Sequence, residues 1–324
     1  MAVQEKYELN IGPQHPSTHG VFRIKVAMNG ETIEDLDMVV GYLHRSMEKL
    51  SEERTFTQNI PFTDRADYLA AMSNNLGYCL AIEKLSNVIP PQRATVLRVI
   101  FAELQRIASH AMANGTLVSD AGAWQTPLMY MFREREKILD LFEMTCGARL
   151  TTNYMRIGGV AFEPPDEFYA QLNSLLGELP DRVDEYMDML SDNEIFIART
   201  KNVGIITPED AINASLSGPA LRGSGVPWDL RKAEPYCGYN EYDFEIPVGN
   251  TGDSYDRFMV RLFEVKESVK IIKQALSILP KGMHKTQIPL ALRPEPDRRR
   301  PGPARSYRAR RPAIPVSSCD NPAP

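Results

Sequence analysis

The chain has 324 residues, of which 43% are hydrophobic and 24% are charged, so its composition is that of an ordinary globular protein with a large core in one or two domains. Its formal net charge is −5, which makes nucleic acid an unexpected partner, because binding to phosphates requires a basic surface. The N-terminus lacks the pattern of a secretion signal, and no run of about 18 apolar residues occurs, so any role at a membrane is expected to be peripheral.

The first distinctive segment along the chain covers residues 12–20, with the sequence GPQHPSTHG. Two glycines bracket it, and glycine permits positive φ angles and a close approach of other groups to the backbone. Two prolines fix φ and disfavour a helix. We therefore expect a stiff loop that carries His15 and His19 directly before a strand. The alternative is an ordinary surface turn between two strands.

Residues 21–40 have the pattern of a β-hairpin. Residues 21–28 alternate between two kinds of side chain, which predicts a half-buried strand, and the apolar set is Phe22, Ile24, Val26 and Met28. The Asn29-Gly30 pair is typical of a two-residue turn, after which residues 31–40 return as a second strand. Residues 43–54 then have the charge spacing of an amphipathic helix, which is ordinarily a solvated face.

Long segments with apolar periodicity predict a bundle of helices. Asp64 is placed to cap a helix over residues 64–87, and a second helix over residues 94–113 would end at Asn114-Gly115. Further helices are expected over residues 126–147, 165–190 and 254–279, with a short one capped by Thr207. The predicted fold class is α+β, mainly α: a long-helix bundle with a small N-terminal antiparallel β portion.

The chain divides into three expected regions: residues 1–58 with the hairpin and the histidine loop, residues 59–290 with the helical bundle, and residues 291–324 as a tail. The tail is rich in Arg and Pro and has no periodicity, so we expect it to be disordered. A basic arm for an acidic partner is one alternative, and out-of-frame sequence in place of the natural C-terminal part is another.

No motif for a resident metal or nucleotide is present. The four cysteines form no Cys-x-x-Cys pair and are typical of a protein in a reducing compartment; they are Cys79, Cys146, Cys237 and Cys319. Gly223-Ser224-Gly225 lacks the third glycine of a dinucleotide fingerprint, and no P-loop occurs, so the chain is not expected to hold NAD or ATP.

Five segments read together resemble one family: residues 12–20, 43–54, 64–68, 156–160 and 221–225. That family is the quinone-site subunit of respiratory complex I, also called the D subunit or the 49-kDa subunit of NADH-quinone oxidoreductase. The resemblance is collinear over residues 7–290. It implies a fold related to the large subunits of nickel–iron hydrogenases.

The resemblance also implies a function. The chain would be a subunit of a proton-translocating NADH:quinone oxidoreductase, inactive alone and peripheral on the cytoplasmic face of the bacterial inner membrane. With an iron–sulfur subunit it would form a pocket for the quinone headgroup, beside the terminal 4Fe-4S cluster of that partner. The chain itself would hold no cofactor and no metal, and other peripheral-arm and membrane-arm subunits would be further partners.

Carried over by position, the resemblance implies that His19 and Tyr68 contact the headgroup, that Asp120 partners His19, and that Arg45 and Arg65 lie near the partner's cluster. These residue types suit the addition of two electrons and two protons, because histidine exchanges protons near a pKa of about 6.5 and tyrosine donates a hydrogen bond. Without the resemblance, Tyr68 would be interpreted as a core aromatic and Asp120 as a capping or turn acid.

Three features depart from the family pattern. Ser46 replaces a Gly or Ala, which should cost little, and Thr151 replaces a histidine that is tied in many members to the pH dependence of the cluster. We therefore expect weak proton-linked tuning and take menaquinone, a low-potential quinone, as the candidate substrate. The family also continues past residue 290 with a β-containing segment, where this chain has its Arg/Pro tail, so we expect the C-terminal closure and stable assembly to be affected.

Two other functions compete with this one. A hydrogenase large subunit would need two pairs of cysteines, which the cysteine positions do not supply. A non-catalytic assembly or scaffold protein of a hydrogenase-related complex is the remaining alternative. His15 and His19 have the spacing of a helical metal pair, but Pro16 between them argues against a helix.

Overall fold

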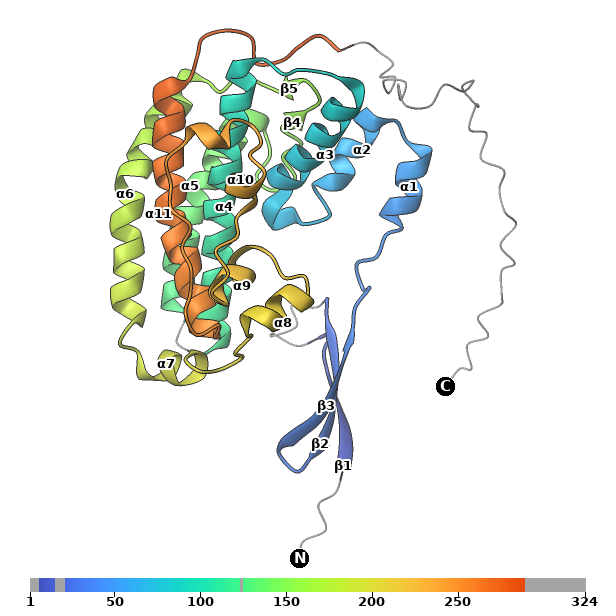
Figure 1. Ribbon diagram of the computed structural model, residues 1–324, viewed down its shortest axis with the longest axis vertical. Coiled ribbons are helices and arrows are strands. Elements are labelled where there is room, and N and C mark those ends of the chain that lie inside the picture. Colours follow the sequence, from blue (N-terminus) through green and yellow to red (C-terminus); the bar gives the residue numbers. More distant parts are fainter. Residues whose placement is uncertain (1–5, 15–20, 123–124, 289–324) are drawn as a thin grey trace, which may run out of the picture.

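Figure 1 shows a computed structural model of the chain, which describes residues 6–14, 21–122 and 125–288. A helical body forms most of the molecule, and a small sheet extends away from it. Within these described ranges, no helix is both long and apolar enough to cross a membrane. The predicted fold class, mainly helical with a small N-terminal antiparallel sheet, is confirmed.

The N-terminal sheet is antiparallel, with the strand order β1–β2–β3. Its strands are β1 (Lys6–Ile11), β2 (Arg23–Asn29) and β3 (Thr32–Val39). β2 and β3 are the predicted hairpin, and Gly30 in its turn has a positive φ of 63°. β1 was not predicted. The histidine loop leads from β1 to β2, but residues 15–20, and with them His15 and His19, lie outside the described residues.

Four helical segments follow the sheet: α1 (Met47–Glu53), α2 (Phe56–Thr63), the 3-10 helix η2 (Tyr68–Ala70) and α3 (Ala71–Ser86). The helix predicted over residues 43–54 is thus reduced to α1, because Ser46 has a left-handed φ of 53° and breaks the helical backbone before Met47. No residue of α1 is buried, which agrees with the solvated face expected of a charge-rich helix.

The prediction that Asp64 caps a helix over residues 64–87 is wrong. Asp64 follows the last residue of α2, a helix that the sequence interpretation missed and that Thr55 begins through a capping box with Gln58. Asp67 then caps η2, and α3 begins only at Ala71. The expected long helix is therefore shortened at its start, where the end of α2, a turn and η2 take its place.

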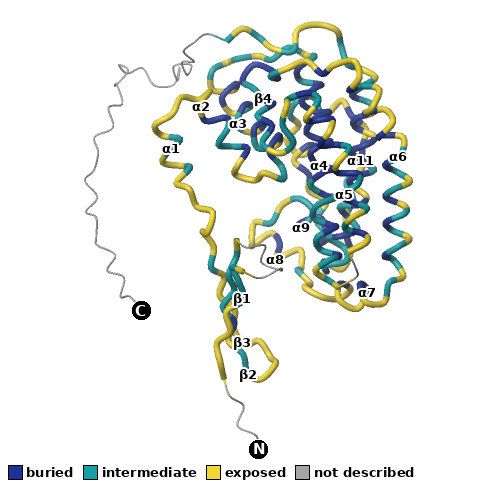
Figure 2. The backbone as a smooth tube through the Cα atoms, turned by 180° about the vertical axis from the view of Figure 1, so that it is seen from behind, coloured by how far each residue is buried: buried dark blue, intermediate teal, exposed yellow. Residues whose placement is uncertain are grey.

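The body is a bundle of α4 (Gln92–Asp120), α5 (Thr126–Cys146), α6 (Asp166–Leu190) and α11 (Ser254–Ile278). α4 lies between α3, α5 and α11, and its buried residues lie all around the helix, as expected for a central helix (Figure 2). The helices predicted over residues 126–147, 165–190 and 254–279 are confirmed as α5, α6 and α11.

Asn114-Gly115 does not end a helix, contrary to the prediction, and α4 continues to Asp120. Both residues are buried. Asn114 Nδ2 donates a hydrogen bond to the carbonyl of Phe258 in α11 at 3.2 Å. A Cβ atom on Gly115 would lie 3.3 Å from Cα of Leu128 in α5, so the missing side chain allows the two helices to approach closely. The pair is a packing site between helices.

Short elements complete the structure. A two-stranded hairpin, β4 (Met155–Arg156) with β5 (Gly159–Val160), packs beside α3 and α4. The segment between α6 and α11 contains α7 (Glu194–Thr200), α8 (Pro208–Asn213), α9 (Gly218–Gly223), α10 (Leu230–Ala233) and the 3-10 helix η3 (Tyr239–Glu241). Among these, α8 was predicted, and its cap Thr207 accepts a hydrogen bond from the amide of Asp210 at 3.1 Å. The division into three regions stays a prediction, and residues 291–324 lie outside the described residues.

Candidate functional site

Tyr68 is the first residue of η2, and its side chain is 48% exposed. Hydrogen bonds hold the backbone around it. The carboxylate of Asp67 accepts from the amide of Leu69 at 3.0 Å, and Gln105 Nε2 in α4 donates to the carbonyl of Leu69 at 2.7 Å. Asn74 Nδ2 donates to the carbonyl of Asp67 at 3.1 Å. The phenol is therefore presented to solvent from a fixed backbone.

The two predicted arginines are both exposed. Arg65 follows α2, and its NH1 donates to the carbonyl of Pro61 at 2.6 Å, which orients the guanidinium on the short helix. Two residues, Ala66 and Asp67, separate Arg65 from Tyr68 along the chain. Arg45 lies in the turn before α1. Because both side chains reach solvent in the isolated chain, their charges are available to a partner.

Asp120 is the last residue of α4 and is exposed. It lies fifteen residues beyond Gln105, the residue of α4 that holds η2, which corresponds to about 22 Å along the helix axis. A tyrosine side chain does not span that length, so the structure does not bring Tyr68 and Asp120 into contact. Tyr68 lies on η2 near the level of Gln105, and Asp120 lies at the end of α4. His19, predicted to lie in this region, is outside the described residues.

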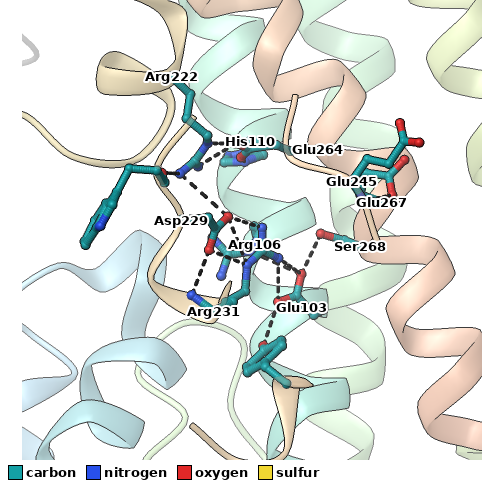
Figure 3. Close-up of polar contacts among 12 residues, drawn as sticks. Glu103, Arg106, His110, Arg222, Asp229, Arg231, Glu245, Glu264, Glu267 and Ser268 are labelled. Atoms are coloured by element: carbon teal, nitrogen blue, oxygen red, sulfur yellow. Dashed lines mark hydrogen bonds and ion pairs between the residues drawn. The ribbon is translucent and has the colours of Figure 1, made fainter. Parts of the chain in front are cut away.

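A buried polar network in the body joins α4, α11 and residues 222–239 (Figure 3). Glu103 of α4, at its centre, has no exposed surface. The hydroxyls of Tyr239 and Ser268 each donate to its carboxylate at 2.6 Å, and Arg231 NH1 donates to both of its oxygens at 3.1 Å. Burial would raise the pKa of Glu103, but Arg106, Arg231 and these hydroxyls together hold it below its usual value.

The second half of the network surrounds Glu264 of α11. Arg222 Nε donates to its Oε1 at 2.6 Å, and His110 Nε2 lies 2.6 Å from its Oε2. Burial raises the pKa of Glu264, yet His110 and Arg222 outweigh burial and hold it at about 2. Burial lowers the pKa of His110 more than the carboxylate raises it. Asp229 links the two halves, because it binds Arg231 at 2.7 Å and lies 3.7 Å from Arg222. The network therefore fastens residues 222–239 to two helices of the bundle.

The family whose description is "respiratory-chain NADH dehydrogenase, 49 kDa subunit" matches residues 120–301 of the chain. A protein of Dehalococcoides mccartyi, named as the D subunit of NADH-quinone oxidoreductase, is 52% identical over 295 residues, which cover 91% of this chain and 80% of the relative. Proteins of the same name in Desulforamulus reducens and Clostridium beijerinckii are 52% and 50% identical over 290 residues, covering 90% of this chain and 79% and 78% of those relatives.

The chain belongs to this family. It is a 49-kDa-type subunit of an NADH-quinone oxidoreductase, so its partners include other subunits of complex I. The resemblance inferred from the five motifs is confirmed. Membership of the family leaves the roles of His19, Tyr68, Asp120, Arg45 and Arg65 as predictions.

Three of the four cysteines lie among the described residues, with Cys79 buried and Cys146 and Cys237 half-buried. Burial raises the pKa of Cys79 to about 12 and the pKa values of Cys146 and Cys237 to about 11, so all three thiols stay protonated at neutral pH. Within residues 6–14, 21–122 and 125–288, no three His, Cys, Asp or Glu side chains are grouped as metal ligands would be. Cys319 lies outside the described residues.

The buried network was not identified from the sequence. One signal for it exists: Glu103, Arg106 and His110 follow one another at intervals of three and four residues, which places them on one face of the central helix. A polar stripe on a central helix indicates buried partners, because unpaired charges are too costly in a core. The identity of those partners depends on the tertiary fold. Arg222, which binds Glu264 in the same network, belongs to the segment 221–225 that carried part of the resemblance.

Proposed function

We propose that this subunit forms, together with an iron–sulfur subunit, the pocket in which the quinone headgroup is reduced. The observation that carries the proposal is the half-exposed phenol of Tyr68. Gln105 of α4 binds the backbone carbonyl of the neighbouring Leu69, and Asp120 lies about 22 Å beyond Gln105 along the same helix. That length along α4 would leave room for a flat redox ring and an imidazole between the level of η2 and the level of Asp120. The chain itself would hold no cofactor, and quinone would be the substrate.

The proposed roles follow from the chemistry of each side chain. Tyr68 would donate a hydrogen bond to one quinone oxygen, where negative charge develops as electrons arrive. His19 would donate to the other oxygen and supply a proton, and Asp120 would orient and stabilise the imidazolium. Arg45 and Arg65 would lie toward the partner's 4Fe-4S cluster, where their permanent charges favour the reduced state. Movement of the histidine loop would couple reduction to proton translocation.

The subunit would sit peripherally on the cytoplasmic face of the bacterial inner membrane, beside membrane-arm subunits. Its helical bundle would share the fold of nickel–iron hydrogenase large subunits. Since Thr151 stands where many family members have histidine, the cluster potential should depend little on pH, and menaquinone is the proposed quinone. A steep dependence of the cluster's midpoint potential on pH in a potentiometric titration would exclude this choice of quinone.

The test of the pocket is the Tyr68→Phe substitution in the assembled complex. The substitution removes one hydroxyl, so we expect the rate of quinone reduction to fall at least tenfold while NADH still reduces the adjacent cluster. Tyr42→Phe is a matched control, because Tyr42 is 47% exposed and Tyr68 48%. A Tyr68→Phe complex with normal turnover would contradict the proposed role and would favour the non-catalytic scaffold alternative.

A further inference from the structure

Gln105 carries a buried amide in the interior of the bundle. It is one of the buried residues of α4 and is only 5% exposed. Burying an amide costs free energy unless its polar atoms are hydrogen-bonded, so packing alone would favour an apolar residue here. Nε2 of Gln105 donates to the carbonyl of Leu69 at 2.7 Å, whereas Oε1 has no hydrogen-bond partner within the described residues. In this part of the chain the buried amide thus serves the backbone of η2.

The turn η2 depends on side chains from outside it. It is a 3-10 helix of only three residues, and 3-10 helices have poorer hydrogen-bond geometry than α-helices. The amides of Leu69 and Ala70 bind the side chain and the carbonyl of Asp67 at 3.0 and 3.1 Å, and both bonds are local. Asn74 of α3 and Gln105 of α4 connect the turn to the bundle. The bond of Asn74 is exposed to water, whereas Gln105 is buried, so Gln105 is the stronger anchor.

The phenol of Tyr68 takes its position from this backbone. Tyr68 is 48% exposed, and its hydroxyl forms no hydrogen bond to another described residue. No polar contact of its own therefore fixes the ring within this part of the chain. Tyr68 directly precedes Leu69, whose carbonyl binds Gln105 from 36 residues away. A shift of η2 relative to α4 would carry the phenol with it.

We propose that Gln105 is a positioning residue for quinone reduction, which holds η2 against α4 so that the phenol of Tyr68 meets the quinone oxygen. The inference rests on the proposed quinone pocket and adds to it a buried residue that acts through the backbone. A displacement of about 1 Å in a reacting group can lower a rate about 100-fold, so a donor at this site needs a fixed support. Gln105 therefore acts on turnover through Tyr68 and not through contact with quinone.

The first experiment replaces Gln105 by Met, which has the same length and no amide, in the assembled complex. Quinone turnover should fall by about tenfold or more, while NADH still reduces the adjacent cluster. Gln105→Asn, which keeps the amide but is one methylene shorter, should show the same loss. Gln274→Met is the matched control and should change turnover less than about twofold, because Gln274 of α11 also donates to a backbone carbonyl, that of Asp243, at 2.7 Å.

Two outcomes of the first experiment would overturn the inference. Normal turnover in Gln105→Met, together with impaired turnover in Tyr68→Phe, would overturn it and leave the quinone pocket intact. A complex that fails to assemble with either Gln105 variant would make Gln105 a structural residue of the bundle.

The second experiment separates positioning from a general structural role. Tyr68→Phe removes the hydroxyl that Gln105 positions, so the addition of Gln105→Met to this variant should lower turnover further by less than about twofold. Independent effects would multiply instead, and a double variant that shows the product of the two single losses would overturn the inference. If Tyr68→Phe alone leaves turnover normal, the proposed pocket is wrong and this inference is wrong with it.

Hydrogen exchange in the assembled complex tests the physical cause. The amide of Ala70 is protected by its bond to the carbonyl of Asp67 within the turn. With Gln105→Met, exchange in the peptide that contains η2 should become about fivefold faster or more, whereas Gln274→Met should leave it unchanged. Unchanged exchange in Gln105→Met would overturn the inference, because any loss of turnover would then have occurred without loosening of η2.

Discussion

Arg98 and Glu83 form a bidentate ion pair in the interior, in which NH1 donates to Oε2 at 3.0 Å and NH2 donates to Oε1 at 2.5 Å. Nε of Arg98 also donates to the carbonyl of Gly159 at 3.2 Å, and the amide of Gly158 donates to Glu83 Oε1 at 2.6 Å. Arg98 has no exposed surface. The pair therefore joins α3, α4 and the β4–β5 turn. The second glycine of that turn is needed because a Cβ on Gly159 would collide with the carbonyl oxygen of His284.

Replacing Arg98 by Lys should destabilise the chain by about 3 kcal/mol, because one ammonium cannot reproduce the paired geometry and leaves buried acceptors without donors. Arg149→Lys is the control, since Arg149 makes its ion pairs with Glu136, Asp140 and Glu143 at the surface and should change stability by less than about 1 kcal/mol. Urea unfolding of both variants measures the difference. Equal losses of stability in the two variants would show that the buried Arg98–Glu83 pair stabilises the chain no more than the surface ion pairs of Arg149 do.

Glu103→Gln should cost about 3–5 kcal/mol, because Arg231 would remain buried, and Arg106 partly buried, beside an uncharged amide. Glu178→Gln removes a carboxylate that binds Lys137 at the surface, and its effect should stay below about 1 kcal/mol. The free energy of unfolding of each variant tests this. A Glu103→Gln chain as stable as the natural one would mean that the network tolerates the loss of its central charge.

Gly115→Val should destabilise the chain by about 2 kcal/mol, since even a Cβ would meet Leu128 Cδ1 at 2.8 Å and Leu128 Cα at 3.3 Å. Gly177 of α6 is also helical, and nothing lies within 4 Å of the position that its Cβ would take. Gly177→Val should therefore be neutral or slightly stabilising, by a few tenths of a kcal/mol. Thermal unfolding compares the pair. If both substitutions behave alike, close contact between α4 and α5 does not explain Gly115.

Asp64 predicts a dependence of stability on pH. Its side chain is completely buried, and burial raises its pKa from 3.8 to about 6, although Arg65, the side chain of Asn75 and the backbone of Asn153 lower it. The folded state therefore binds this proton more tightly than the unfolded state, so stability falls as the pH rises from about 4 to about 6 and then levels off.

Asp64→Asn removes this titration. The variant should match the natural chain near pH 4 and exceed its stability by up to about 3 kcal/mol at pH 8, from about 1.36 kcal/mol per pKa unit. Urea unfolding at several pH values from 4 to 8 gives both curves. A constant difference between them over this range would contradict the raised pKa of Asp64.

Elements with strong local signals were predictable. Thr126-Pro127 begins α5, and Gly147 ends it with a left-handed φ of 72°, so the sequence itself marks both ends. The β2–β3 hairpin was likewise marked by alternation and by Asn29-Gly30. These signals act within a few residues of one another, and the fold of the rest of the chain leaves them unchanged.

The wrong predictions concern residues whose surroundings come from elsewhere in the chain. Asn114-Gly115 has the form of a helix stop, but α5 and α11 convert it into a contact site. Asp64 has the form of a cap, but the carboxylate is buried at the end of α2. For the candidate site, the sequence identified Tyr68 and Asp120 through the family resemblance. It could not supply η2, because the hydrogen bond that holds this turn comes from Gln105, 36 residues away from Leu69.

The continuous helix α4 fixes the spacing between the residue that holds η2 and Asp120. Gln105 and Asp120 lie on the same helix, so the number of residues between them determines both their separation and their relative orientation about the helix axis. Inserting a single residue between them would rotate Asp120 by about 100° and shift it by about 1.5 Å, without altering any side chain of the candidate site. Substitutions between Gln105 and Asp120 leave the orientation of Asp120 relative to Gln105 unchanged, whereas insertions and deletions change it.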